Sequence, residues 1–194
     1  MKLFAIGAFT LASLAATGAA AQAQGPQNPG PALPGVCVYF NQRAMAQSTA
    51  GQAVQARMEQ LATEVRGELQ PYATAIQTEA QALQAGAQTI PADQQNQRRQ
   101  ALQQRVQEAQ QLEQTRDNEL RYTLSEQRKK ITEVIEPILV AVYQERGCGI
   151  MIDRESVYMV NPAMDVTDVI IQRANAALPT LSFSRLQVPV QQAQ

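Results

Sequence analysis

The residues of this chain that could carry out chemistry are two cysteines and a few clustered carboxylates. The sequence contains no histidine, so neither a Ser–His nor a Cys–His catalytic pair can form. Asp153 and Glu155 fall in an expected polar turn, where both carboxylates are solvated. Asp165 and Asp168 stand where acidic residues favour the start of a helix. The sequence also lacks a glycine-rich phosphate loop, and it therefore predicts a protein that is not an enzyme.

Cys37 and Cys148 each lie at the start of an expected strand, and their pairing depends on how those strands run. Parallel strands would bring the two thiols close enough for a disulfide. Antiparallel strands would separate them beyond the roughly 7 Å between Cα atoms that a bridge allows. Both alternatives remain open, although an oxidising compartment favours the bond. Two thiols without histidine make a poor metal site, and a thiol without a nearby base is a poor nucleophile. We expect no metal, no cofactor and no catalytic residue.

The chain begins with the three parts of a secretory signal peptide. Met1-Lys2 is positively charged, residues 3–16 are apolar, and small residues then permit cleavage after Ala23, or alternatively after Ala21. The apolar stretch is shorter than the roughly 20 residues that a membrane-spanning helix needs, which argues against an anchor. No later segment is apolar enough to span a bilayer. We expect export to the periplasm and removal of the signal peptide.

Two long stretches with helical spacing of apolar residues dominate the sequence. One helix is expected over about residues 44–86 and the next over 91–146, with only a short break between them, so residues 44–146 predict an antiparallel hairpin. Its arms should be roughly 60 to 80 Å long. The apolar stripe of the first helix consists of Val54, Met58, Leu61, Val65, Leu69, Tyr72, Ile76 and Leu83. Pro71 and Pro137 are expected to bend the helices, and the glutamine-rich tip should be weakly held.

The other segments predict a small β-rich body on either side of this arm, and the fold class is α+β, mostly α. The body consists of residues 36–43 and 147–177. Residues 24–35 are rich in proline and glycine and predict a linker. Residues 178–194 contain two prolines and no clear period, and we interpret them as a loose C-terminal tail.

The body should contain three short strands. They are expected at residues 36–40, 150–152 and 157–160, the last two as a β-hairpin, followed by a short helix that Asp165 or Thr167 caps. The expected core of the body consists of Val38, Phe40, Ile150, Ile152, Val157 and Met159. Three strands enclose little apolar volume and leave sheet edges open. We therefore expect the body to oligomerise into a barrel.

The order of these elements resembles the Skp/OmpH family of periplasmic chaperones over about residues 36–177. Residues 47–53, QSTAGQA, are similar to the Ser-x-x-Gly segment that opens the first arm in this family. Residues 150–154 and 157–167 look like its closing strand pair and its Asn-Pro…Asp-x-Thr segment.

The resemblance implies a homotrimer whose strands form a central barrel. Three helical hairpins project from it and enclose a cavity, in which unfolded outer-membrane β-barrel proteins are held without ATP. Contacts that are multivalent and individually weak would let such a client leave without an energy source.

The charge of this chain differs from that of the basic members of the family, because its formal net charge is −1. Positive charge gathers only near the tip and near the root of the arm. These candidate contacts to acidic client segments or to lipid are Arg98, Arg99, Arg105, Arg128, Lys129 and Lys130. The alternative is that they form solvated helix faces balanced by neighbouring glutamates. Any contact with the membrane surface should be weak, lipopolysaccharide binding stays open, and nucleic acid is not an expected partner.

A structural coiled-coil spacer or adaptor of the cell envelope is the alternative function. A permanent coiled-coil partner requires a continuous apolar seam. The stripe in this chain is diluted by glutamine and alanine and interrupted by Pro71 and Pro137. The sequence therefore favours the adaptable surface of a chaperone.

Overall fold

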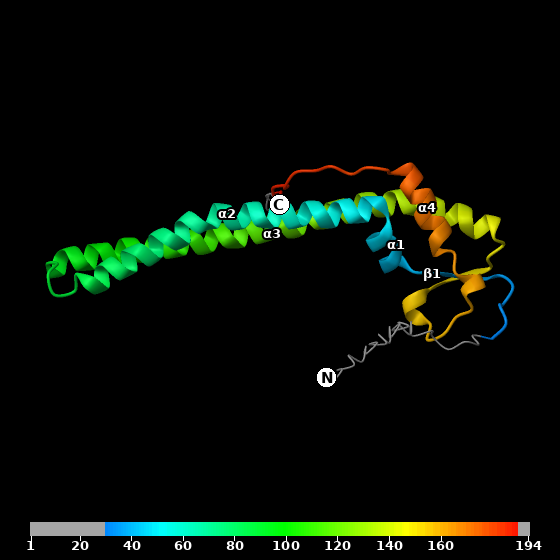
Figure 1. The fold of residues 1–194 in the computed structure, drawn as a ribbon, viewed down its shortest axis with the longest axis horizontal. Coiled ribbons are helices and arrows are strands. Elements are labelled where there is room, and N and C mark those ends of the chain that lie inside the picture. Colours follow the sequence, from blue (N-terminus) through cyan, green and yellow to red (C-terminus); the bar gives the residue numbers. More distant parts are fainter. Residues whose placement is uncertain (1–29, 190–194) are drawn as a thin grey trace, which may run out of the picture.

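A computed structural model describes residues 30–189 of the chain. The predicted signal peptide, the first part of the predicted linker and the last five residues lie outside the described residues. The elements in chain order are β1 (Val36–Tyr39), α1 (Asn41–Gln47), α2 (Thr49–Ala85), α3 (Ala92–Glu145), β2 (Ile150–Asp153), the 3-10 helices η1 (Arg154–Ser156) and η2 (Pro162–Met164), and α4 (Thr167–Ala177). Figure 1 shows α2 and α3 as a long hairpin that projects from a small body at one end.

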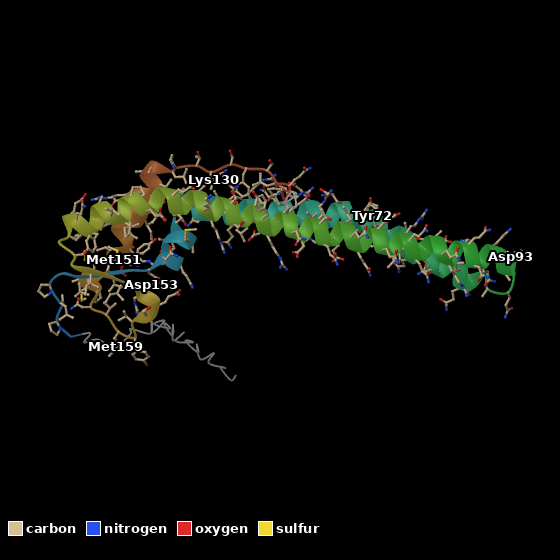
Figure 2. The ribbon with its side chains drawn as sticks, turned by 180° about the vertical axis from the view of Figure 1, so that it is seen from behind. Tyr72, Asp93, Lys130, Met151, Asp153 and Met159 are labelled. Atoms are coloured by element: carbon tan, nitrogen blue, oxygen red, sulfur yellow. A yellow bond between two sulfur atoms is a disulfide. The ribbon has the colours of Figure 1, made fainter. Side chains whose placement is uncertain are left out.

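The hairpin confirms the expected mostly helical architecture. Helix α2 has 37 residues and α3 has 54, which correspond to about 55 and 80 Å at 1.5 Å per residue. Both helices continue through their prolines, Pro71 and Pro137. Because α3 is longer, its C-terminal part extends past the start of α2 and packs against α4 in the body. The tip of the hairpin, where Asp93 lies, is therefore at the opposite end of the molecule from the body (Figure 2).

The chain breaks the first helix at Ser48, where the sequence predicted a single helix from residue 44. Ser48 has an extended backbone, and its hydroxyl accepts a hydrogen bond from the backbone N–H of Gly51 at 3.1 Å. This is a helix N-cap, and it begins α2 in a new direction. A Cβ atom at Gly51 would overlap the carbonyl group of Met45, so only glycine permits this close turn. The Ser-x-x-Gly segment is therefore a helix-break motif.

The sheet has two parallel strands in the described residues. The register pairs Val36 with Ile150 and continues to Tyr39 with Asp153. On the other side of β1, the backbone N–H of Val166 donates to the carbonyl oxygen of Val38 at 2.9 Å. Strand β1 therefore lies centrally, and β2 has one neighbour only.

The predicted return strand at residues 157–160 is wrong. The side chain of Asp153 accepts a hydrogen bond from the backbone N–H of Glu155 at 2.9 Å and caps η1. This local turn directs the chain away from β2, and residues 157–160 form no regular element. The position expected for a hairpin strand is left open, and a segment near Asp165 pairs with β1 instead.

The core of the single chain differs from the expected one in its composition. Of the six residues expected in it, Val38 is buried, Phe40, Ile152 and Val157 are half-buried, and Ile150 and Met159 are exposed. The exposed pair belongs to the open edge of β2 and to the segment that forms no strand. The core lies instead where β1, α1, the C-terminal part of α3 and α4 meet, around Tyr39, Ala44, Val142 and Ile170.

A disulfide joins Cys37 to Cys148. Their Cα atoms are 5.7 Å apart, and both residues are almost fully buried. Of the two open alternatives, the structure has the parallel one, in which both strands begin at the same edge of the sheet. The bond links β1 to the residue just beyond α3, so it closes a loop that contains the whole arm.

The described part of the predicted C-terminal tail is not loose. Residues 178–189, called the tail below, run from α4 back along the hairpin toward its middle (Figure 1). Leu178, Leu181 and Phe183 pack against the core cluster. Arg57 Nε donates to the carbonyl oxygen of Phe183 at 3.1 Å, which holds the tail on α2.

Candidate functional site

Three of the four acidic residues singled out in the sequence, Asp153, Asp165 and Asp168, have structural partners in the body. Arg43 forms ion pairs with Asp165 at 3.5 Å and with Asp168. Asp165 also accepts a hydrogen bond from the backbone N–H of Thr167 at 2.8 Å, beside the start of α4. Within residues 30–189, no group of three or more acidic, cysteine or histidine side chains is placed to hold a metal ion. The ion pairs of Asp165 and Asp168 with Arg43 therefore fasten α1 to the start of α4 within the body.

A groove of about 890 Å³ lies at the root of the arm, between α1, α2 and α3. Its apolar lining, which defines the root groove, includes Met45, Val54, Met58, Leu124 and Ile131. Methionine side chains are unbranched and polarisable, so they adapt to differently shaped apolar partners. Glu59 and Arg128 also line the groove and offer both signs of charge.

The seam between α2 and α3 changes its chemistry along the arm. Its buried residues on α3 recur mostly every four positions: Glu119, Thr123, Gln127, Ile131 and Ile135. The apolar members lie toward the body, and the polar members lie near the middle. In the part of the arm from Val65 to the tip, Leu83 is the only further buried apolar side chain among the described residues. The root is therefore held by apolar packing, and the distal half is held weakly.

Two arginines and two glutamates form a charge cluster in the middle of the arm. Arg116 on α3 pairs with Glu68 on α2 at 2.7 Å and with Glu119 at 3.0 Å. Arg185 of the tail pairs with the same carboxylates, at 2.9 Å to Glu68 and 3.0 Å to Glu119. The hydrogen bond from Arg185 is the main cause that lowers the pKa of Glu68 below its usual value. The tail thus contributes half of the positive charge of this cluster.

The predicted basic cluster at the tip is partly engaged within the chain. Arg98 donates to both carboxylate oxygens of Glu79 across the hairpin, at 2.7 and 2.9 Å. This hydrogen bonding lowers the pKa of Glu79. Arg99 is exposed and donates to Gln95 at 3.4 Å, and Arg105 is exposed. Arg98 therefore connects the two helices of the arm, which leaves Arg99 and Arg105 facing solvent.

The basic cluster at the root is exposed. Arg128, Lys129 and Lys130 follow one another on α3, and Figure 2 places Lys130 on the arm near the body. The structure does not bring the root and tip clusters together, because they lie at different heights on the same long helix. Sequence inspection missed Arg57, Glu68 and Arg185, which join the tail to the arm. The signal for them was the alternation of apolar and polar residues in LSFSR at 181–185.

Large apolar side chains are exposed on the body as well. Tyr158 is 96 % exposed, and Met159 and Ile150 are more than half exposed. Figure 2 shows Met151, Asp153 and Met159 in the body, on the same end of the molecule. The body therefore offers apolar surface and an unpaired strand edge, which are features of an incomplete sheet.

The fold and the site define a class of protein in which a small body carries a long helical arm with an apolar groove at its root. The family model for outer membrane protein (OmpH-like) matches residues 35–173 of the chain. The protein belongs to this OmpH-like chaperone family, whose members are not enzymes.

A solved structure agrees with this assignment. The chain is similar to a candidate outer membrane chaperone (OmpH-like) from Caulobacter crescentus, with 36% sequence identity and a TM-score of 0.74. The match covers 84% of this chain and 96% of that one. No match was found among the curated proteins. Among residues 30–189, no helix combines the length and the apolar character that crossing a membrane requires.

Proposed function

We propose that the protein is an ATP-independent periplasmic holdase. It encloses unfolded outer-membrane β-barrel proteins between helical arms and prevents their aggregation. The observation that carries this proposal is the α2–α3 hairpin, which projects far beyond the body and has few buried apolar side chains in its distal half. Family membership over residues 35–173 supports it.

The distribution of packing along the arm suits this function. The root is anchored in the core, so the arm keeps a defined origin. The distal half has few buried contacts, so it can bend at low free-energy cost around clients of different sizes. The methionine-lined root groove and scattered apolar surface provide weak contacts that add up over a long chain. A client can then be retained and released without ATP.

We further propose a homotrimer in which the bodies form a shared barrel. The open edge of β2 and the exposed Ile150 and Met159 would be covered by pairing with other copies, which would complete the core that the sequence predicted. Residues 36–43 and 147–177 would then form the oligomerisation body, residues 44–146 the arm, and cleavage near Ala23 would release the exported chain. Arg128, Lys129 and Lys130 at the root, and Arg99 and Arg105 at the tip, are the proposed contacts to acidic client segments or to lipid.

The test of the holdase is suppression of aggregation. A urea-unfolded outer-membrane barrel protein is diluted into buffer that contains the mature chain, and light scattering is followed. Near-stoichiometric trimer should suppress the scattering. Unchanged scattering would contradict the holdase and favour the spacer or adaptor. Size exclusion coupled to light scattering tests the assembly separately, and a monomer would contradict the shared barrel.

A further inference from the structure

The tail crosses the middle of the arm as an extended segment. Residues 178–189 contain no helix or strand, yet they follow the surface of the hairpin (Figure 1). Leu181, Phe183 and Arg185 are partly buried, whereas Ser182 and Ser184 between them are exposed. This alternation is that of a β-strand lying on a surface. The arm therefore already binds one peptide in extended form.

Part of this binding does not depend on the sequence of the tail. Arg57 Nε on α2 donates to the carbonyl oxygen of Phe183 at 3.1 Å. The backbone N–H of Leu186 donates to the hydroxyl of Thr123 on α3 at 2.8 Å. Every extended peptide offers a carbonyl oxygen at the position of Phe183. Every peptide without proline at the position of Leu186 also offers the backbone N–H. The arm thus recognises main chain through side chains of both helices.

Arg185 completes the charge balance of the surface beneath it. With Arg185 present, two guanidinium groups face the carboxylates of Glu68 and Glu119. Glu119 has a side chain only 7% exposed with the tail in place, and without Arg185 the guanidinium of Arg116 alone would face both carboxylates. A site with excess negative charge favours binding of a cation. The uncovered surface would therefore prefer a peptide with a basic side chain at this position.

The tail is an imperfect occupant of this surface. Nη1 of Arg185 is buried and has no hydrogen-bond partner among the described residues. Unpaired buried groups of this kind are unfavourable. A better-matched segment can therefore displace the tail.

We propose that the surface beneath the tail, called the tail groove and formed by Arg57, Glu68, Glu119 and Thr123, binds extended client segments. Such a segment has alternating apolar side chains and a basic residue, and the tail occupies the groove until the segment displaces it. This inference rests on the proposed holdase function. Strands of outer-membrane barrels alternate apolar and polar side chains, so their unfolded chains contain many segments of this pattern.

The tail then acts as an intramolecular competitor for clients. A tail that closes the groove about nine-tenths of the time lowers the apparent affinity of the groove for a client about tenfold. The tail lies beyond residues 35–173, the part of the chain that the family model matches.

Tryptophan fluorescence tests displacement directly, because the chain contains no tryptophan. In Phe183→Trp the single indole should emit at short wavelength while the tail is bound. A synthetic peptide of residues 178–189 at millimolar concentration should shift this emission to longer wavelength. The same peptide with its arginine replaced by glutamate should not. Tyr158→Trp, at a fully exposed position of the body, is the control reporter. If Phe183→Trp itself frees the tail, Leu181→Trp carries the reporter.

Client binding is tested with Arg185→Glu, which places a carboxylate against Glu68 and Glu119. Release of the tail should lower the chain concentration needed for half-suppression of client aggregation about tenfold. Arg121→Glu is the matched control, since Arg121 also lies on α3 and pairs, among the described residues, with Asp117 at 2.9 Å and with no residue of the tail. It should leave suppression unchanged.

The outcomes separate this inference from the holdase function. An unshifted tryptophan at millimolar peptide, or unchanged or weaker suppression by Arg185→Glu, would overturn the tail groove and leave the tail as a fixed strap. Peptide displacement in a chain that suppresses no aggregation would overturn the holdase and keep the groove. Displacement together with stronger suppression by Arg185→Glu supports both.

Discussion

Removal of the Cys37–Cys148 disulfide, by Cys37→Ala together with Cys148→Ala, should strongly destabilise the chain. The two residues are 111 positions apart. The entropy of closing a loop of this size in the unfolded chain corresponds to about 4.8 kcal/mol at 25 °C. The loop contains the whole arm, and residual helix in the unfolded state would reduce its freedom. We therefore expect a loss of about 3 to 5 kcal/mol in the free energy of unfolding.

The measurement is guanidinium unfolding followed by circular dichroism at one fixed chain concentration, because assembly makes stability depend on concentration. A loss of this size should lower the midpoint by on the order of 1 M. Reductant should bring the wild-type chain to the midpoint of the double variant, and it should leave the double variant unchanged. A difference below about 0.5 kcal/mol would refute the reasoning, since it is within the range of an ordinary surface substitution.

Three further predictions concern a pair of glycines, a buried amide and an ion pair of the arm. Gly51→Ala should lower the free energy of unfolding by about 1–3 kcal/mol, because the new methyl group overlaps the backbone of Met45. Gly67→Ala has open space around it and should stabilise the helix by about 0.5–1 kcal/mol. Thermal melts of the two variants compare them, and equal shifts would contradict the prediction. Gln127→Leu should be neutral or stabilising, because it removes two buried unpaired polar atoms, and a clear fall in the urea midpoint would show that the amide has a partner. The hydrogen bond from Arg98 lowers the pKa of Glu79. The stabilisation of the tip by this ion pair is therefore fully present above the ordinary glutamate pKa, and it is lost as the pH falls through the lowered pKa. Hydrogen exchange at the tip, corrected for intrinsic rates, should accelerate in acid, and Arg98→Ala should abolish that pH dependence.

The arm could be predicted from the sequence because its information is local. The spacing of Val54, Leu61 and Val65 matches one face of a helix, and all three are buried. The short break between two long helices allows only an antiparallel hairpin. The burial of polar residues in the middle of the arm, including a glutamate at position 119, was not predicted, because the periodicity argument considers apolar residues only.

The body was harder to predict because its structure depends on contacts between distant segments. The VYMV sequence at 157–160 has the composition of a strand, but the cap at Asp153 turns the chain away before it can pair. The helix break at Ser48 depends on the close approach of Gly51 to the end of α1, which helix propensity does not show. Parallel pairing of β1 and β2 requires the whole arm as the crossover connection. These features follow from tertiary geometry, which overrides local preference.

The tail explains why the middle of the arm is polar. In an isolated two-helix coiled coil, Glu119, Thr123 and Gln127 would weaken the seam, since each is a buried polar residue among apolar ones. In this chain a third segment lies on the seam at that height, and both Glu119 and Thr123 bind it. The interruption of the apolar stripe therefore reflects a change from two packed segments to three. The carboxylate of Glu119 pairs with Arg116 of α3 and also with Arg185 of the tail, so this buried charge serves the contact of three segments and not only that of two helices.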